Sequence, residues 1–272
     1  MRTRTFGLDK DTIAFANRVY AGSGVKIFGT PLKQLNKFVV GIKRMGLWNS
    51  MVCWPMRSIH NAGTGSTVYS LGGLGVYNGT MVNGPTWSDS GIVLLNNTQS
   101  ITYSPSIYID MVNGGLNAAA VWSAYGQTVQ LSDVLYFIVS SGSEFTYNAT
   151  SGVGGGTTLR TQVRNVVSPG SSIYDASIFY EQLITANPSQ NFFSAWSATR
   201  KLHVYNGVYN PVGTVTTTSP ASGLYNIRSM GRGASSKARM SFVFVATATR
   251  DVDYAALYKL YRTILGNTLG LV

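Results

Sequence analysis

The sequence has few of the residue types from which catalytic and metal sites are commonly built. Of its 272 residues, 11% are charged, two are histidine and one is cysteine. Its two glutamates, Glu144 and Glu181, lie far apart in the chain. A single cysteine excludes an internal disulfide and cannot form a zinc site by itself. Cys53, between Val52 and Trp54, is expected to be a small buried residue.

This shortage argues against the common hydrolytic mechanisms. Retaining glycoside hydrolases hold two carboxyl groups about 5 to 5.5 Å apart, and Glu144, Glu181 and Asp110 stand in no paired motif. His60 and His203 are not near a Gly-x-Ser-x-Gly turn, so we expect structural histidines. The sequence also has no Asp-x-Asp-x-Asp calcium loop. We therefore expect no enzymatic activity, no cofactor and no metal ion.

Long apolar segments are missing too. No run of about 18 apolar residues is present, so a membrane-spanning helix is not predicted. The first residues, MRTRTFGLDKD, carry charge without an apolar segment behind them, which is not the pattern of a secretory signal. We expect a chain that is made in the cytoplasm and has no membrane partner.

The net charge of +11 is distributed unevenly. Ten Lys or Arg and two Asp give residues 1–57 a net charge of +8, whereas residues 58–159 contain four acids and no Lys or Arg. This segregation indicates a basic end that meets an acidic partner. The basic residues stand singly, without the runs or aromatic motifs typical of nucleic-acid binding. The pattern therefore favours an acidic protein surface over nucleic acid.

Residues 1–30 combine glycines with scattered basic residues, and only Ile13–Val19 shows apolar periodicity. The pattern predicts an extended basic arm, which would become ordered only against another chain because it buries too little surface alone. A loosely docked extension of the same domain fits the pattern equally well. The side chains expected to anchor the arm to an acidic partner are its cations: Arg2, Arg4, Lys10, Arg18 and Lys26.

Two helices are predicted, one near each end of the remaining chain. The first begins at Pro31, which suits a first helical turn, and carries an apolar stripe as far as Ile42. Residues 47–55 then leave this helix as an apolar connection. The second helix covers Asp251–Leu265, with Asp251 as its N-cap.

Between these helices the sequence alternates short strands and turns. Asn-Gly after Lys201–Tyr205 predicts a hairpin with a two-residue turn. Met240–Ala246 is almost continuously apolar and is expected in the middle of a sheet. Residues 151–156 are expected to form a glycine-rich loop. More than ten short strands without α/β alternation predict one all-β domain, an antiparallel β-sandwich with flanking helices.

Several segments resemble a known group of proteins. Leu35–Met51, LNKFVVGIKRMGLWNSM, resembles the start of bacteriophage virion proteins in which a V-x-G-L-K-x-x-G-L-W helix precedes a concanavalin A-like or laminin G-like jelly roll. Tyr77–Thr86 is similar to the first hairpin of that group. Lys201–Val208 resembles a hairpin of the lectin and glucanase superfold, and Arg239–Gly266 resembles its last strand and closing helix.

The resemblance implies that residues 31–272 form one jelly-roll domain behind the arm at residues 1–30. It also implies a structural protein on the exterior of a phage particle, as a capsid decoration, collar, tail or fibre component. Such a protein would be made in the host bacterial cytoplasm and would lie in the virion. Its partners would be other virion proteins, reached through the basic arm, and further copies of itself in a homo-oligomer.

A glycan-binding adhesin or receptor-binding protein for the host surface is the alternative function, and a polysaccharide depolymerase is the third. Lectin sites on jelly rolls stack aromatic rings on sugars and use Asn and Asp to hydrogen-bond the hydroxyls. The candidate residues for such contacts would suit a subunit interface equally well: Trp87, Trp196, His203, Tyr205, Asn206 and Tyr209.

Overall fold

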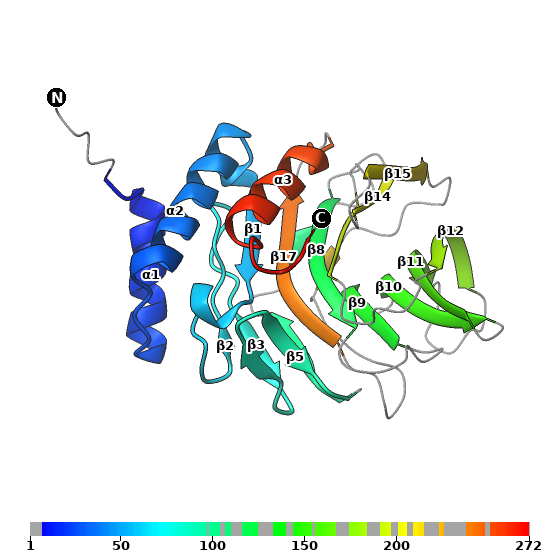
Figure 1. The fold of residues 1–272 in the computed structure, drawn as a ribbon, viewed down its shortest axis with the longest axis horizontal. Coiled ribbons are helices and arrows are strands. Elements are labelled where there is room, and N and C mark those ends of the chain that lie inside the picture. The colour runs from blue at the N-terminus through cyan, green and yellow to red at the C-terminus, as the bar shows by residue number, and fades with distance from the viewer. Residues whose placement is uncertain are drawn as a thin grey trace.

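The computed structural model places helices at both ends of the chain around antiparallel sheets (Figure 1). The residues that the structure describes are 7–96, 98–103, 107–109, 116–124, 133–139, 144–153, 156–166, 174–183, 191–196, 201–205, 209–214, 223–225, 238–247 and 251–271. None of the helices in these ranges is long and apolar enough to cross a membrane.

The N-terminal segment is helical where an extended arm was predicted. Residues Lys10–Ser23 form α1, which packs against α2 and buries Thr12, Phe15 and Val19. The expectation of an extended conformation is therefore wrong for this stretch. Its periodicity is weak because apolar residues such as Ile13 also occupy the exposed side of the helix. A domain boundary at residue 30 stays a prediction.

The two predicted helices are present. The first is α2, Gly29–Arg44, with Pro31 in its first turn. The second is α3, Tyr254–Ile264, whose N-cap is Asp253 rather than Asp251, because the Asp253 carboxylate accepts a hydrogen bond from the Ala256 amide. The two helices cross closely at Gly41, where an added Cβ would lie 2.4 Å from a methyl carbon of Leu260.

The main sheet has eight strands in the described residues, and β17 lies at its centre. Along one edge β17 pairs with β8, and along the other it pairs first with β5 and then with β1. The central position predicted for Met240–Ala246 is confirmed, and all seven residues are buried. The strands are β1 (Met51–Pro55), β4 (Thr86–Ser88), β5 (Gly91–Leu94), β8 (Leu116–Ala124), β13 (Phe192–Trp196), β14 (Lys201–Tyr205), β15 (Tyr209–Thr214) and β17 (Ala238–Thr247).

The remaining described strands form three smaller sheets, and all their pairings are antiparallel. Two short 3₁₀ turns, η1 (Trp48–Ser50) and η2 (Ser58–His60), flank β1. The strands are β2 (Thr67–Val68), β3 (Gly79–Val82) and β6 (Ser100–Tyr103) in one sheet; β9 (Asp133–Val139), β10 (Glu144–Val153), β11 (Gly156–Val166) and β12 (Tyr174–Leu183) in another; and β7 (Ile107–Ile109) with β16 (Gly223–Tyr225).

Three local expectations are wrong. Residues 51–55, expected in a connection, form β1, which is buried throughout. The glycine-rich segment at 151–156 belongs to a hairpin, because β10 reaches Val153 and pairs it with Gly156 of β11. Tyr205 pairs with Tyr209, so three residues rather than two separate the paired ends of β14 and β15.

The helices cover one face of the main sheet and form the core with it (Figure 1). The ring of Phe38 on α2 lies 5.6 Å from that of Phe242 on β17, centroid to centroid. On the other side Phe242 packs against Tyr261 of α3 at 4.6 Å. Cys53 is fully buried in this core, as the sequence predicts.

Candidate functional site

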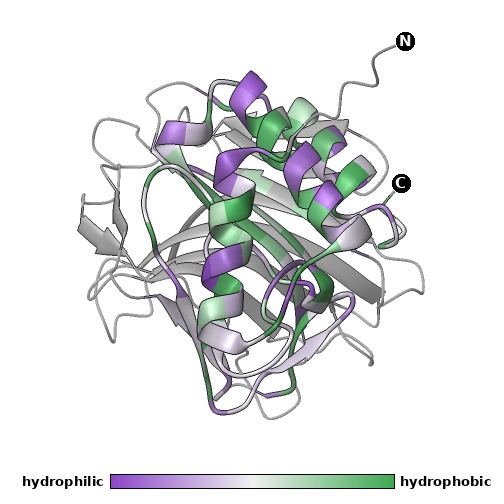
Figure 2. Ribbon diagram, turned by 90° about the vertical axis from the view of Figure 1, so that its left-hand side faces the viewer, coloured by the Kyte–Doolittle hydropathy of each residue, from purple (hydrophilic) through white to green (hydrophobic). Residues whose placement is uncertain are grey.

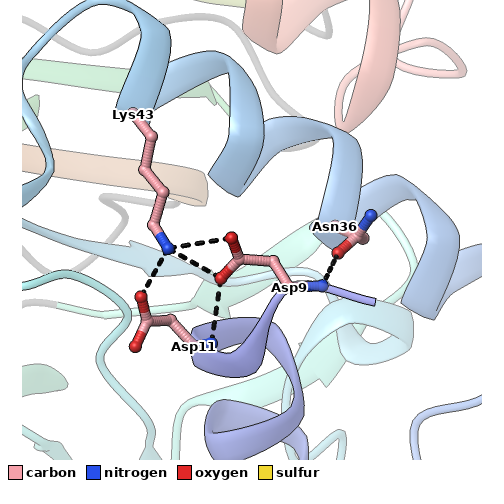
Figure 3. Close-up of polar contacts among 4 residues, drawn as sticks. All are labelled: Asp9, Asp11, Asn36 and Lys43. Atoms are coloured by element: carbon pink, nitrogen blue, oxygen red, sulfur yellow. Dashed lines mark hydrogen bonds and ion pairs between the residues drawn. The ribbon is translucent and has the colours of Figure 1, made fainter. Parts of the chain in front are cut away.

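Two aspartates and a lysine join the start of α1 to α2 (Figure 3). Asp9 is the N-cap of α1, and its Oδ1 accepts a hydrogen bond from the Asp11 amide at 2.9 Å. The Lys43 ammonium donates to both carboxylate oxygens of Asp9, at 2.7 and 2.9 Å, and lies 2.6 Å from Oδ2 of Asp11. The Asp9 amide donates to Asn36 Oδ1 at 2.6 Å. These contacts orient α1 against α2.

The ion network shifts the pKa values of Asp9 and Lys43. Burial alone would raise the pKa of Asp9, but the hydrogen bonds from Lys43 and from the Asp11 amide, together with the Lys43 charge, hold this pKa below its usual value. Burial alone would lower the pKa of Lys43, whereas its hydrogen bonds to Asp11 and Asp9 raise that pKa. Both shifts favour the charged forms of Asp9 and Lys43.

A cleft of about 570 Å³ opens beside this network. Its volume falls within the range of roughly 300 to 1,000 Å³ that is usual for small-molecule sites. It lies where the N-terminus of α1 meets the C-terminal end of α2 and the 3₁₀ turn η1. The lining residues are Lys10, Asp11, Lys43, Gly46, Trp48, Asn49 and Gly73.

Several polar groups of the cleft have no partner within the described part of the chain. Lys10 and Asn49 are exposed, and neither side chain makes a hydrogen bond or ion pair there. Asp11 bonds Lys43 through Oδ2, which leaves its Oδ1 available. The indole N–H of Trp48, a half-buried residue, also has no acceptor among the described residues. The cleft thus offers three donors and one carboxylate oxygen to a ligand.

Trp48 is held in place from two sides. The Lys43 ammonium lies 5.1 Å from the centroid of its ring, within the range of a cation–π contact. The Gly73 amide donates to the Trp48 carbonyl at 2.9 Å. A Cβ at Gly73 would lie 2.9 Å from the indole nitrogen, so glycine lets the backbone approach this edge of the ring closely. These contacts hold the half-buried indole in place beside the cleft.

Of the residues that the sequence singled out for glycan contact, Trp87 is the one whose side chain the structure describes, and it does not line this cleft. Trp87, on β4, is half buried, and its indole N–H donates to the Gly65 carbonyl at 3.0 Å. Asn206 lies outside the described residues. The other candidates sit on adjacent strands of the main sheet, with Ala195 paired to His203, and their role stays a prediction: Trp196 on β13, His203 and Tyr205 on β14, and Tyr209 on β15.

Of the cations predicted to anchor the arm, the three that the structure describes lie in different surroundings. Arg2 and Arg4 lie outside the described residues. Lys10 lines the cleft, and Lys26 is exposed after α1. Arg18 donates through Nη2 to the Ser70 carbonyl at 2.8 Å, so it ties α1 to the strand region. The anchoring role of these residues stays a prediction.

Apart from Lys10, which was singled out for a different role, the sequence did not identify the residues of the cleft as a site. The Asp9-x-Asp11 pair ahead of a helical segment is a capping signal that would have located the start of α1. No local signal places Lys43 next to it, because the two partners are 34 residues apart. Among the described residues, no group of three or more His, Cys, Asp or Glu is arranged to hold a metal ion.

No protein-family model matches the chain, and no curated protein sequence matches it. Its fold does resemble solved structures. The binding domain of botulinum neurotoxin serotype D aligns with a TM-score of 0.52 and 8% identity, over 80% of this chain and 54% of that one. Domain 4 of AbnA, a GH43 extracellular arabinanase from Geobacillus stearothermophilus, solved with arabinotriose, has a TM-score of 0.41 and 15% identity, over 77% and 87%.

Glycosidases are also among the similar structures. A mutant of Trypanosoma rangeli sialidase that displays trans-sialidase activity has a TM-score of 0.48 and 10% identity, over 86% of this chain and 39% of that one. The expectation that this chain is not an enzyme is therefore wrong as an exclusion. The search for paired glutamates tests one catalytic design only, since sialidases use a tyrosine nucleophile.

At these identities the comparisons concern the fold. They agree with the antiparallel pairing of the described strands and with the helices confined to the two ends of the chain. The chain thus has an antiparallel β-sandwich fold with helices at its two ends, as the sequence predicts.

Proposed function

We propose that this chain is a glycan-binding module and that the cleft between α1, α2 and η1 is its ligand site. The observation that carries the proposal is the set of free polar groups in the cleft. Lys10, Trp48 and Asn49 supply donors, and Asp11 supplies an acceptor, around one edge of an indole ring.

This combination suits a sugar better than an apolar ligand. Each sugar hydroxyl both donates and accepts hydrogen bonds, so it can donate to Asp11 Oδ1 and accept from Asn49 or Lys10. The edge of Trp48 offers apolar carbon next to an N–H donor, which matches the mixed surface of a pyranose ring. A site that is already rigid loses less conformational entropy on binding, and the contacts of Lys43 with Asp9 and Asp11 provide that rigidity.

The test is a glycan array, followed by calorimetry on any glycan that binds. Lys10→Ala combined with Asn49→Ala removes two exposed side chains without disturbing the core. We expect affinity to fall at least tenfold, because each lost hydrogen bond is worth about 0.5 to 1.5 kcal/mol, and more for the charged donor. Asn17→Ala, at an exposed position of α1 outside the cleft, should bind as the unmodified protein does.

Two results would overturn this assignment. One is an array without any bound glycan at high protein concentration. The other is an affinity that is unchanged in the Lys10→Ala/Asn49→Ala variant, which would move the site away from the cleft. Product analysis after long incubation with a bound glycan determines whether the module also cleaves it.

A second proposal concerns the setting of the module. The resemblance of Leu35–Met51 to phage virion proteins favours display on the outside of a particle, as a capsid decoration, collar, tail or fibre component. In the structure this segment runs from α2 through η1 into β1 and supports one wall of the cleft. An antibody against the chain should label intact particles in electron micrographs. Absence of the chain from purified particles would refute this setting.

A further inference from the structure

The outer side of α1 and α2 carries positive charge without local compensation. In the described residues up to 57, the only acids are Asp9 and Asp11, and both are paired with Lys43. Five cations in the same part of the chain are exposed and make no ion pair there: Lys10, Lys26, Lys33, Lys37 and Arg44. The potential of this surface therefore attracts an acidic partner.

Helix α1 and the residue before α2 also expose large apolar side chains. Ile13 and Tyr20 of α1 are 42% and 57% exposed, and their spacing of seven residues places them on one face of the helix. Phe28, which precedes α2, is 69% exposed. Figure 2 looks onto this side of the molecule and shows hydrophobic and hydrophilic stretches alternating along the helices. Exposed apolar side chains on elements that also carry unpaired charges are a feature of protein docking surfaces.

A groove of about 340 Å³ lies at the connection between α1 and α2. Ile27, Phe28, Pro31 and Ile59 supply apolar walls, and Lys26 stands at its edge. This concave site has room for one or two side chains of a partner. It is separate from the cleft at Trp48, with which it shares no lining residue.

We propose that the α1–α2 face docks an acidic amphipathic segment of a partner protein. An apolar side chain of that segment occupies the groove beside Phe28, and its carboxylates pair with Lys26, Lys33 and Lys37. A concave groove favours a protein over a flat membrane surface. Singly spaced cations with exposed apolar residues between them favour it over nucleic acid. The proposal is independent of glycan binding, because it uses a different part of the surface.

The experiment uses the full chain and a fluorescent 18-residue helical peptide with Glu along one face and Leu along the other. We expect saturable binding that weakens as salt is raised. A scrambled peptide of the same composition should bind at least tenfold more weakly, because it cannot present Leu to the groove. Lys26→Glu/Lys33→Glu/Lys37→Glu and, separately, Phe28→Ser should each weaken binding at least tenfold.

The matched control is Lys259→Glu, a charge reversal at an exposed position of α3, which should change the affinity less than twofold. Equal binding of the two peptides, or an equal loss in Lys259→Glu, would overturn the proposal. So would binding of anionic vesicles or duplex DNA without binding of the amphipathic peptide. Glycan affinity measured on the same variants separates this surface from the cleft, since loss of one need not affect the other.

Discussion

Two polar centres hold distant parts of this chain together, and they differ in their access to water. The network of Asp9, Asp11 and Lys43 is partly exposed, with 18 to 30% of each side chain accessible. Arg57, after β1, is only 5% exposed. Its guanidinium donates to the carbonyls of Asp89 and Leu265, and to Thr268 Oγ1 at 2.7 Å.

The two centres differ in what they contribute: the buried one to stability and the exposed one to recognition. Arg57 has lost its hydration, so the protein must satisfy its donors by exact placement of three acceptors. One acceptor is the carbonyl of Leu265, the C-cap of α3. A cation at this end of the helix is also favoured by the helix dipole. The Lys43 network keeps contact with water and contributes less to stability, but its neighbours retain free polar groups. We therefore expect the buried centre to dominate folding and the exposed centre to dominate binding.

The largest expected effect is that of Arg57→Met. The substitution leaves the buried Leu265 carbonyl without its donor and removes the hydrogen bonds to the Asp89 carbonyl and Thr268 Oγ1. We therefore expect a loss of about 2 to 4 kcal/mol in the free energy of unfolding, measured with urea. The matched control is Arg44→Met at the exposed end of α2, which should change stability by less than about 0.5 kcal/mol. Similar losses in the two variants would contradict the distinction between the centres.

The next effect concerns His60, which lies beside Arg57 and is fully buried. Its Nε2 is 2.9 Å from Gln34 Oε1. Burial, with a smaller contribution from the Arg57 charge, lowers the pKa of His60 to about 3. The folded state therefore holds a neutral histidine, and its stabilisation is complete above the unfolded pKa of about 6.5 and is lost as pH falls toward 3.

The measurement is urea unfolding at pH 7, 5.5 and 4.5. This histidine should make stability fall by up to about 1.4 kcal/mol per pH unit in that window. The glutamine in His60→Gln does not titrate between pH 7 and 4.5. The free energy of unfolding of this variant should therefore fall less steeply with decreasing pH than that of the unmodified protein. Identical pH dependence of the variant and the unmodified protein would show that His60 does not titrate as a buried group.

The smallest expected effect is that of Lys43→Met in the exposed network. We expect a loss of about 1 kcal/mol at neutral pH, reduced by added salt. The lowered pKa of Asp9 means that its contribution is present above about pH 4 and is lost as pH falls through the folded pKa. The difference between Lys43→Met and the unmodified protein should therefore shrink below pH 4.

A double-mutant cycle with Asp9→Asn isolates the charge interaction. Asparagine caps helices about as well as aspartate, so α1 keeps its N-cap in this variant. We expect a coupling energy of about 0.5 to 1 kcal/mol between Asp9 and Lys43. A coupling energy near zero would show that the network serves orientation alone.

The sequence predicted the elements whose signals are local. Pro31 and the apolar stripe that follows it predict α2, and the continuous apolar run at Met240–Ala246 predicts the central strand. His60 was expected to be a hydrogen-bonded structural residue, and its contact with Gln34 confirms this. These features depend on residues within one helix or strand, where periodicity and capping act.

The sequence did not predict elements that depend on distant partners. Helix α1 has weak periodicity, and its docking depends on Lys43, 34 residues away. Strand β1 was taken for a connection because its burial comes from pairing with β17 and from coverage by the helices. A continuous apolar run of five residues does not by itself distinguish a strand from a buried loop.

By itself, the sequence determined the fold class, the two helices around the strands and the concentration of positive charge near the start of the chain. Only the tertiary structure decided which polar groups are hydrogen-bonded within the protein and which remain free for a ligand. The Arg57 guanidinium donates a hydrogen bond to the carbonyl of Leu265, 208 residues away. The side chains of Lys10 and Asn49 line the cleft without a partner among the described residues. The physical reason is that hydrogen bonding and burial depend on contacts between distant segments, which the pattern of one segment does not contain.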